Sequence, residues 1–271
     1  MASSLHISFL SFSSAPSLPA TSRSTSRHIR CSGSGGGGGS SSTERQQLFS
    51  RIAPVYDQLN DLLSLGQHRV WKRMAVSWSA AKSGDRVLDL CCGSGDLAFL
   101  LSEKVGVDGK VFGLDFSNEQ LLRASSRQYS LAKSCYNNIE WIEGDALNLP
   151  FTDSFFDAIT CGYGLRNVVD KPKAMREVFR VLKPGSTVSI LDFNKSTQPI
   201  TVSFQEWMID NVVVPAARVY GLEEEYEYLK SSIQNFLTGK ELEDLALYSG
   251  FSVVDHYEIA GGLMGNLVAK R

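Results

Sequence analysis

The sequence predicts an α/β fold built on a mostly parallel, doubly wound sheet of seven strands that closes with an antiparallel hairpin. From residue 86 onward, short runs rich in β-branched and apolar residues alternate with longer segments of helical spacing. Such alternation is typical of parallel sheets whose crossovers are helices. The last two strand-like runs have no helix between them, so we expect them to pair antiparallel.

The expected strands share a β-branched or apolar centre and are bounded by glycine or polar residues. In chain order they are residues 86–90, 111–115, 139–142, 157–161, 187–191, 251–259 and 265–269.

The expected helices are bounded by capping and breaking residues. Ser117 and Thr238 are suited to cap helix starts, Pro184-Gly185 to stop a helix, and Gly250 to end the last one. Pro54 interrupts the first helical segment. The segments are residues 44–74, 96–104, 117–133, 170–182, a helical insertion over 199–235, and 238–249.

Composition excludes several classes of function. The 271 residues carry a formal charge of -2 and no basic stripe, so nucleic acid is not an expected partner. The five cysteines have no C-x-x-C spacing, which argues against a disulfide framework and a structural metal site. No apolar run reaches the ~18 residues that a membrane-spanning helix needs.

Residues 1–43 differ from the remainder of the chain. They are rich in serine, contain three arginines and no acid, and end in a Gly/Ser run. This composition buries too little apolar surface to fold and is typical of an organelle transit peptide followed by a linker. We expect plastid import, with a mitochondrial presequence as the alternative. A mitochondrial presequence would form a basic amphipathic helix, whereas the first 22 residues carry no basic group except His6. Cleavage is expected near Cys31.

A glycine turn follows the first strand, and acidic residues end the strands beside it. Gly93 and Gly95 let the backbone approach a ligand at the carboxyl end of the strand. Asp89, four residues before Gly93, is suited to meet a cationic or N–H-bearing part of that ligand. Asp115, twenty residues after Gly95, is suited to bind ribose hydroxyls, and Asp145 to accept from an adenine amino group.

The same turn matches the dinucleotide fingerprint G-x-G-x-x-A over residues 93–98, so NAD must be weighed against S-adenosylmethionine. Asp96 at the start of the helix opposes a pyrophosphate, whereas Asp89 and Asp145 suit a methionine and an adenine. These features favour S-adenosylmethionine. Phe116 either stacks on the adenine or is an ordinary core aromatic.

Four segments resemble the ubiquinone/menaquinone biosynthesis C-methyltransferases. They are residues 51–61 (RIAPVYDQLND), 64–72 (SLGQHRVWK), 156–168 (FDAITCGYGLRNV) and 225–233 (EYEYLKSSI). The resemblance covers residues 44–271, within which residues 44–78 form a helical cap. It implies the class I S-adenosylmethionine-dependent methyltransferase fold, which is Rossmann-like and needs no metal.

The resemblance also implies roles for individual residues. The positions that match contacts to S-adenosylmethionine are Ser94, Asp115, Asp145, Ala146 and Gly162. Many relatives have serine where Gly162 stands, so a side-chain contact is lost there. The positions that match the quinol side of the site are Arg166 and Asn167, which face the ring, and Tyr56, Asp61 and His68 from the cap.

The expected reaction is C-methylation of a prenylated naphthoquinol, which in plant members converts demethylphylloquinol to phylloquinol. A mitochondrial benzoquinol of ubiquinone synthesis is the alternative, and a catalytically silent binder on this fold is another. The reduced ring is the better nucleophile. Arg166 would stabilise the phenolate and Asn167 hold the other oxygen, while either His68 or Asp61 would be the base.

The helical insertion has three interpretations. Its apolar residues around Phe204 and Trp207 could cover a prenyl chain, contact the plastid membrane peripherally, or face the core. Their helical spacing is partial, and Pro215 is expected to break the run. The oligomeric state stays open.

Overall fold

The computed structural model describes residues 66–219 and 223–271, which lie in one compact unit of the chain. Three predictions fall on residues outside these ranges. They are the transit peptide with its linker, most of the helical cap, and the site residues Tyr56 and Asp61.

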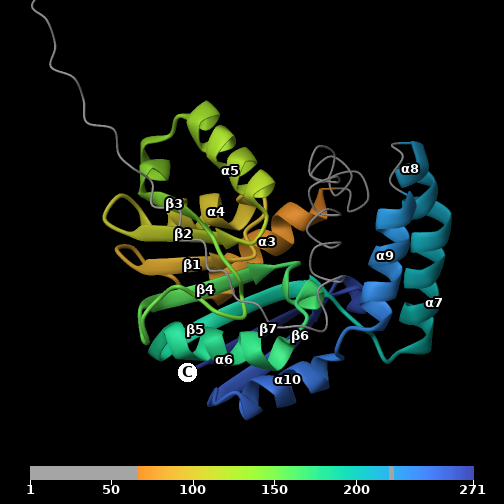
Figure 1. The fold of residues 1–271 in the computed structure, drawn as a ribbon. Helices are drawn as coiled ribbons and strands as arrows, with labels where there is room; N and C mark the ends of the chain where they lie inside the picture. Colours follow the sequence, from red (N-terminus) through yellow and green to blue (C-terminus); the bar gives the residue numbers. More distant parts are fainter. Residues whose placement is uncertain (1–65, 220–222) are drawn as a thin grey trace, which may run out of the picture. The chain divides into compact units, whose positions relative to one another are not determined.

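A seven-stranded sheet in the order β3-β2-β1-β4-β5-β7-β6 forms the centre of the unit (Figure 1). Strands β1 to β5 are parallel, and β7 is antiparallel to both β5 and β6. The predicted fold is therefore confirmed, with its C-terminal hairpin. The strands are β1 Arg86–Leu90, β2 Lys110–Asp115, β3 Ile139–Glu143, β4 Phe156–Gly162, β5 Leu182–Phe193, β6 Val253–Ile259 and β7 Met264–Lys270.

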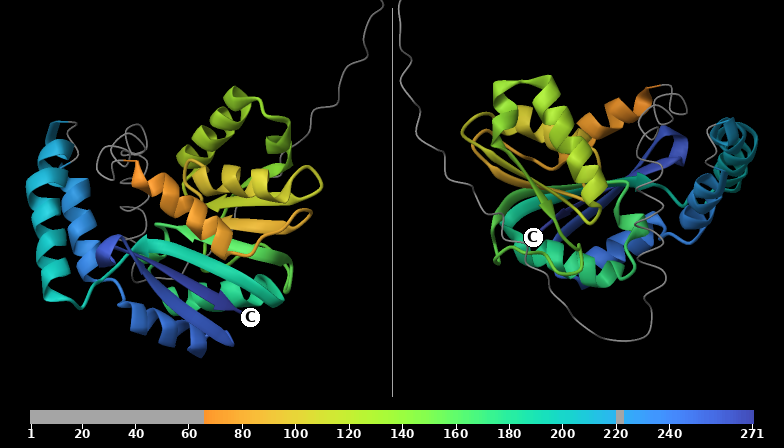
Figure 2. Two further views of the ribbon diagram at one scale, coloured as in Figure 1. Left: turned by 180° about the vertical axis from the view of Figure 1, so that it is seen from behind. Right: turned by 45° about the horizontal axis from the view of Figure 1, so that its top comes forward.

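Helices cover both faces of the sheet (Figures 1 and 2). One face carries α3 Gln67–Trp78, α4 Asp96–Val105 and α5 Asn118–Leu131, and the other carries α6 Lys171–Val181 and α10 Gly239–Tyr248. Short helical turns are η1 Ser134–Asn138, η2 Leu165–Asn167 and η4 Ala260–Gly262. Both predicted caps are confirmed, because the side chain of Ser117 accepts from the Gln120 N–H and Thr238 forms a capping box with Glu241.

Alternation along the central strands divides the core in two. Val87 and Ala158 pack with helices α3 and α4, whereas Leu88 and Ile159, one residue later, pack with α6 and α10. Successive side chains of a strand point to opposite faces, so strands covered on both faces are apolar throughout.

The boundary between α6 and β5 differs from the prediction. The helix ends at Val181, and the strand begins at Leu182, so Pro184 and Gly185 lie inside a twelve-residue strand. Proline disfavours helical backbone at the residue before it, and Gly185 adopts φ +80°. The pairing of β4 with β5 is irregular here, because the register shifts between Phe156 and Ala158.

The insertion consists of α7 Pro199–Met208, the π-helical turn η3 Ile209–Val213, α8 Val214–Val219 and α9 Glu223–Gln234. The expectation that Pro215 breaks the run is wrong, because α8 continues through it. Proline has no N–H to donate, and the wider π turn immediately before it changes the hydrogen-bond pattern where that donor is missing.

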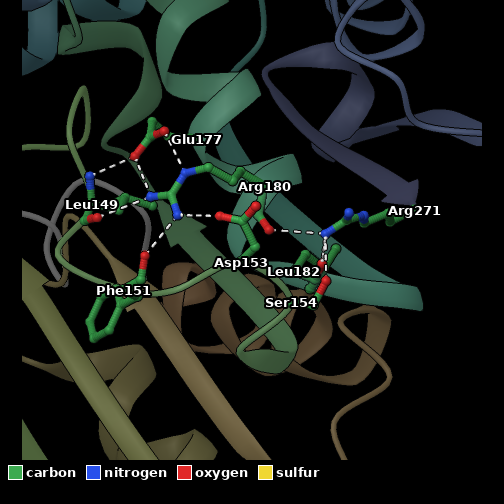
Figure 3. Close-up of polar contacts among 8 residues, drawn as sticks. All are labelled: Leu149, Phe151, Asp153, Ser154, Glu177, Arg180, Leu182 and Arg271. Carbon is green, nitrogen blue, oxygen red and sulfur yellow. Dashed lines mark hydrogen bonds and ion pairs between the residues drawn. The ribbon is translucent and has the colours of Figure 1, made fainter.

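Arg180 near the end of α6 holds the loop between β3 and β4 (Figure 3). Its Nε and Nη2 donate to the two carboxylate oxygens of Glu177 at 2.8 and 2.7 Å, and Nη2 also donates to the Leu149 carbonyl. Nη1 donates to the Phe151 carbonyl and to Asp153. All five N–H groups of the guanidinium thus have an acceptor.

The C-terminal residue joins the same region. Nη1 of Arg271 donates to the hydroxyl of Ser154 and to the carbonyls of Arg180 and Leu182 (Figure 3). The end of α6, the start of β5 and the end of β7 are therefore held together on the side of the sheet away from the glycine turn.

Two features are absent from residues 66–219 and 223–271. No helix there is long and apolar enough to cross a bilayer, and no group of three or more His, Cys, Asp or Glu side chains is arranged to hold a metal ion.

Candidate active site

The candidate site lies at the carboxyl ends of β1, β2, β4 and β5. Strand order reverses between β1, which leads on to β2 and β3, and β4, which leads on to β5. Crevices at such switch points bind ligands in open α/β sheets. The residues that end these strands and the glycine turn after β1 therefore define the site.

Positive φ angles shape the glycine turn. Gly93 and Gly95 have φ of +53° and +91°, and the Gly95 N–H closes the turn on the Cys92 carbonyl at 2.9 Å. A Cβ on Gly95 would lie 2.6 Å from Trp141, whereas one on Gly93 would meet nothing within 4 Å among the described residues. Gly95 is thus required for packing, and Gly93 leaves open space where a ligand is expected.

Asp89 on β1 has one satisfied and one unsatisfied oxygen. Its Oδ1 accepts from the Thr160 hydroxyl at 2.9 Å, and its Oδ2 has no hydrogen-bond partner among the described residues. The side chain is only 1% exposed, and burial raises its pKa from 3.8 to about 7. A buried carboxylate oxygen without a donor is costly, and a cationic ligand group would satisfy it.

Asp115 at the end of β2 holds the glycine turn. Its Oδ2 accepts from the Gly93 N–H at 2.8 Å and its Oδ1 from the Ser117 N–H at 2.9 Å. Burial raises the pKa of this carboxyl, and these N–H groups oppose the rise. Asp145 is close in the fold, because the preceding Gly144 N–H donates to the Asp115 carbonyl.

The other residues predicted to contact the cofactor near its adenine lie around the ends of β2 and β3. Asp145 is exposed, and its Oδ1 accepts from the Leu147 N–H at 2.9 Å. Ala146 is buried in the core. Phe116 is 37% exposed, so it is not a fully buried core aromatic.

Two cations that were not predicted flank Asp96, the first residue of α4. Lys72 from α3 contacts Oδ2 at 2.5 Å, and Arg127 from α5 contacts Oδ1 at 2.7 Å. Burial opposes ionisation of Asp96, but the two cations lower its pKa to about 2. Arg127 also donates to the carbonyl and hydroxyl of Ser94. The turn is therefore fixed by three helices, and a fixed anion stands where a pyrophosphate would bind.

Arg166 and Asn167 form the turn η2 after β4, at the other side of the site. Arg166 Nε lies 3.2 Å from Oδ1 of Asp192, an ion pair without hydrogen-bond geometry, and the Arg166 backbone N–H donates to Oδ2 at 3.0 Å. Burial raises the pKa of Asp192, and Arg166 opposes the rise. Asp192 was not predicted. Its position directly after the buried run 188–191 places it at the end of a strand, where Asp115 was predicted to act, and the same pattern could have indicated it.

Helix α9 reaches this pair from the insertion (Figure 1). Nη1 of Arg166 donates to Oδ1 of Asn167 at 2.8 Å and to the Ser232 hydroxyl at 2.9 Å. The Tyr228 hydroxyl donates to the same Asn167 oxygen at 3.1 Å, and Nδ2 of Asn167 donates to the Tyr163 carbonyl at 3.2 Å.

Aromatic rings connect the two sides of the site. Lys72 lies 5.8 Å from the centre of the Tyr163 ring, which lies 5.8 Å from the Phe193 ring, and Arg166 lies 5.4 Å from Phe193. Each ring of this pair therefore lies within cation–π distance of a cation, Tyr163 of Lys72 and Phe193 of Arg166. His68 is buried on α3, one turn before Lys72 and on the same helix face.

Gly162, the last residue of β4, faces a close neighbour. A Cβ at this position would lie 2.6 Å from Cδ1 of Leu97. A serine at this position would require the end of the Leu97 side chain to move.

Comparisons with known proteins agree on family and fold. A family model described as the ubiE/COQ5 methyltransferase family matches residues 39–270. The chloroplastic 2-phytyl-1,4-beta-naphthoquinone methyltransferase of Arabidopsis thaliana is 68% identical over 254 residues, which are 93% of this chain and 94% of that protein. The 2-phytyl-1,4-naphtoquinone methyltransferase of Nostoc punctiforme is 54% identical over 84% of this chain and 98% of its own.

Among solved structures, an S-adenosylmethionine-dependent methyltransferase from Aquifex aeolicus superposes with a TM-score of 0.57. The match has 19% sequence identity and covers 79% of this chain and 96% of that one. At this identity the likeness shows the fold alone.

Proposed function

The chain belongs to the ubiE/COQ5 methyltransferase family, and we propose that its reaction is methyl transfer from S-adenosylmethionine to a ring carbon of a prenylated naphthoquinol, which converts demethylphylloquinol to phylloquinol. The observation that carries the proposal is the pairing of two different sites at one sheet edge. Asp89 offers an unsatisfied carboxylate oxygen for a cation, and Arg166 offers a held cation for a developing anion.

The residues around the glycine turn fit S-adenosylmethionine. The unsatisfied oxygen of Asp89 suits the positive charge of the methionine part, and Asp115 lies beside the turn, where ribose hydroxyls are expected. Ser94, Asp145, Ala146, Phe116 and the backbone of Gly162 complete the proposed contacts. When bound, S-adenosylmethionine supplies an electrophilic methyl group. The ion-paired Asp96 disfavours a dinucleotide, whose pyrophosphate would meet this carboxylate.

On the quinol side, the protein must favour the ionised phenol. Loss of a phenolic proton places negative charge on the oxygen and on the ring carbon that becomes the nucleophile. The guanidinium of Arg166 stabilises that charge in a site of low solvent exposure, and Asn167 binds the second oxygen. His68 and Asp61 are the two candidates for the base, and Asp61 lies outside the described residues.

The names of the relatives support a naphthoquinol and a plastid. Proteins from a plant and from a cyanobacterium, both more than half identical to this chain, carry names with a phytylated naphthoquinone, and the plant protein is named chloroplastic. They give no support to the alternative of a mitochondrial benzoquinol. Uptake of the full chain by isolated plastids, with removal of the N-terminal segment, and not by mitochondria, would test the location.

Peripheral membrane contact is part of the proposal. A phytylated quinol resides in a bilayer, and α7 presents apolar side chains to the outside. Phe204 and Trp207 are 47% and 55% exposed, and their rings stack with centroids 6.4 Å apart. Ile200, one turn earlier, is exposed as well. Residues spaced this way share one helix face, and aromatic side chains on such a face favour the membrane interface.

The deciding experiment is methyl transfer by the purified chain from labelled S-adenosylmethionine to matched quinones, each offered reduced and oxidised. We expect label in the reduced phytyl-naphthoquinol and little in its oxidised form or in a benzoquinol. Label in the benzoquinol alone would reject the proposed substrate. Binding of S-adenosylmethionine without labelling of any quinol would support a silent binder instead.

A further inference from the structure

The guanidinium of Arg166 is held by groups from two elements that are far apart in sequence. Asp192 of β5 lies against Nε, and Ser232 of α9 accepts from Nη1 at 2.9 Å. The second hydrogen of Nη1 is taken by Asn167. Nη2 makes no hydrogen bond to the described residues and is not among their fully buried polar atoms. One nitrogen of the fork is thus left able to donate.

Ser232 is oriented to accept from Arg166. Its hydroxyl donates to the Leu229 carbonyl of its own helix at 2.7 Å. A hydroxyl has one proton and two lone pairs, so the bond to Leu229 leaves only lone pairs for Nη1. In the contact between α9 and the guanidinium, Arg166 is therefore always the donor and Ser232 the acceptor.

Tyr228 holds the neighbouring amide of Asn167, but as a donor. It precedes Ser232 by four residues, so the two side chains lie on one face of α9. Its hydroxyl lies 3.1 Å from Oδ1 of Asn167, which also accepts from Arg166. Two donors on this oxygen fix which end of the amide is the acceptor.

We propose that Ser232 and Tyr228 are positioning residues for the proposed methyl transfer, which hold Arg166 and Asn167 so that Nη2 of Arg166 is the donor to the phenolate oxygen. The inference rests on the proposed function. It gives the insertion a role in the chemistry, because α9 supplies one of the two acceptors that hold Nη1 of the arginine.

Loss of one of these contacts has a specific consequence. An arginine side chain is long and flexible, and the fork donates well only when it is held in one orientation. Without the Ser232 hydroxyl, Nη1 regains a free hydrogen and the guanidinium can turn away from the quinol oxygen. The phenol then ionises less readily, so turnover needs a higher pH.

The test compares Ser232→Ala with Ser231→Ala. Ser231 is the adjacent residue on α9, is exposed, and donates only to the Tyr228 carbonyl, so its loss removes a hydroxyl without touching Arg166. Ser232→Thr keeps the hydroxyl, and Tyr228→Phe removes only the second contact. Each protein is measured for kcat and KM over a pH series, for S-adenosylmethionine affinity and for unfolding temperature.

We expect Ser232→Ala to lower kcat about tenfold, which corresponds to roughly 1.4 kcal/mol, and to move the rise of kcat to higher pH. Ser232→Thr should restore both, and Tyr228→Phe should show a smaller change of the same kind. Cofactor affinity should be unchanged, and Ser232→Ala should unfold at the same temperature as Ser231→Ala.

A measurement without turnover supports the same comparison. The visible absorbance of bound 4-nitro-1-naphthol reports its ionised fraction, and its apparent pKa in the site should be higher in Ser232→Ala than in Ser231→Ala. If the wild-type chain methylates the naphthoquinol and the two alanine variants match in both measurements, the positioning role is wrong. If the wild-type chain neither methylates a quinol nor binds the naphthol, the proposed function itself fails and the inference with it.

Discussion

Asp89 makes cofactor affinity depend on pH in a predictable direction. Burial raises the pKa of its carboxyl to about 7, so the ionised fraction increases about tenfold between pH 6 and pH 8. A cationic ligand binds the ionised form. We therefore expect the Kd of S-adenosylmethionine to fall by up to about tenfold over this range, as measured by isothermal titration calorimetry.

Asp89→Asn is the control, because it cannot ionise there. Asp89→Asn should bind S-adenosylmethionine more weakly than the wild-type chain at pH 8. Its Kd should not show the tenfold change that ionisation of Asp89 causes, whereas any pH dependence from other groups should remain. Identical slopes for the two proteins would mean that Asp89 does not meet the charge of the cofactor.

Arg166→Lys separates charge from geometry. Lysine keeps the positive charge but loses the planar fork that contacts Asn167 and Ser232. We expect kcat to fall about 100-fold, in the range seen when one donor to a developing oxyanion is lost, while the Kd for S-adenosylmethionine stays the same. Turnover near the wild-type level would remove Arg166 from the mechanism.

The sequence predicted the residues whose roles follow from their place on a strand. Asp89 and Asp115 lie at the ends of strands that the pattern identified, and the structure places both at the glycine turn. Lys72, Arg127 and Ser232 were not predicted, because what matters about them is a partner 24 to 66 residues away. Only the packing of helices against the sheet brings such pairs together.

Among the elements, α6 depends on Arg180 for its link to the loop before β4. Lysine at this position has three donors instead of five and a single nitrogen, so it cannot reach Glu177, Asp153 and two carbonyls together. We expect Arg180→Lys to lower the free energy of unfolding by about 1–3 kcal/mol, as measured by urea denaturation.

The same variant should keep its kcat per folded molecule, since Arg180 lies away from the glycine turn and from Arg166. A loss of kcat without a loss of stability would contradict this assignment and would connect the loop to the active site.

Boundaries of helices and strands were predicted correctly where a nearby side chain determines them. They were missed where pairing between distant strands determines them. The caps at Ser117 and Thr238 are made by side chains within three residues of the helix start, and both were expected. The start of β5 at Leu182 depends on its pairing with Phe156, which no local pattern contains.

For the whole folded unit, the alternation of strands and helices was enough to predict the sheet and its hairpin, because right-handed crossovers leave few ways to arrange parallel strands. The position of the insertion was not predictable in this way. A helical segment after β5 carries no signal for the strand ends that it approaches, and the contacts of Tyr228 and Ser232 reveal it.

The exposed face of α7 yields a prediction for the protein as a whole. Burying a large apolar side chain contributes roughly 1.5–3 kcal/mol, so Phe204→Glu and Trp207→Glu should each weaken sedimentation with lipid vesicles by at least about tenfold. Tyr129→Glu is the matched control, because Tyr129 is an aromatic residue on α5 with 89% exposure. It should bind vesicles as the wild-type chain does.

Kinetics extend the vesicle test to the working enzyme. If α7 contacts the bilayer, Trp207→Glu should raise KM for phytyl-naphthoquinol in vesicles and leave KM for a short-chain quinol in solution unchanged. Arg166 and Asn167 are bound by α9 and not by α7, so kcat should hold in both assays. If Trp207→Glu and Phe204→Glu bind vesicles as well as Tyr129→Glu does, the exposed aromatic residues of α7 do not contact the membrane.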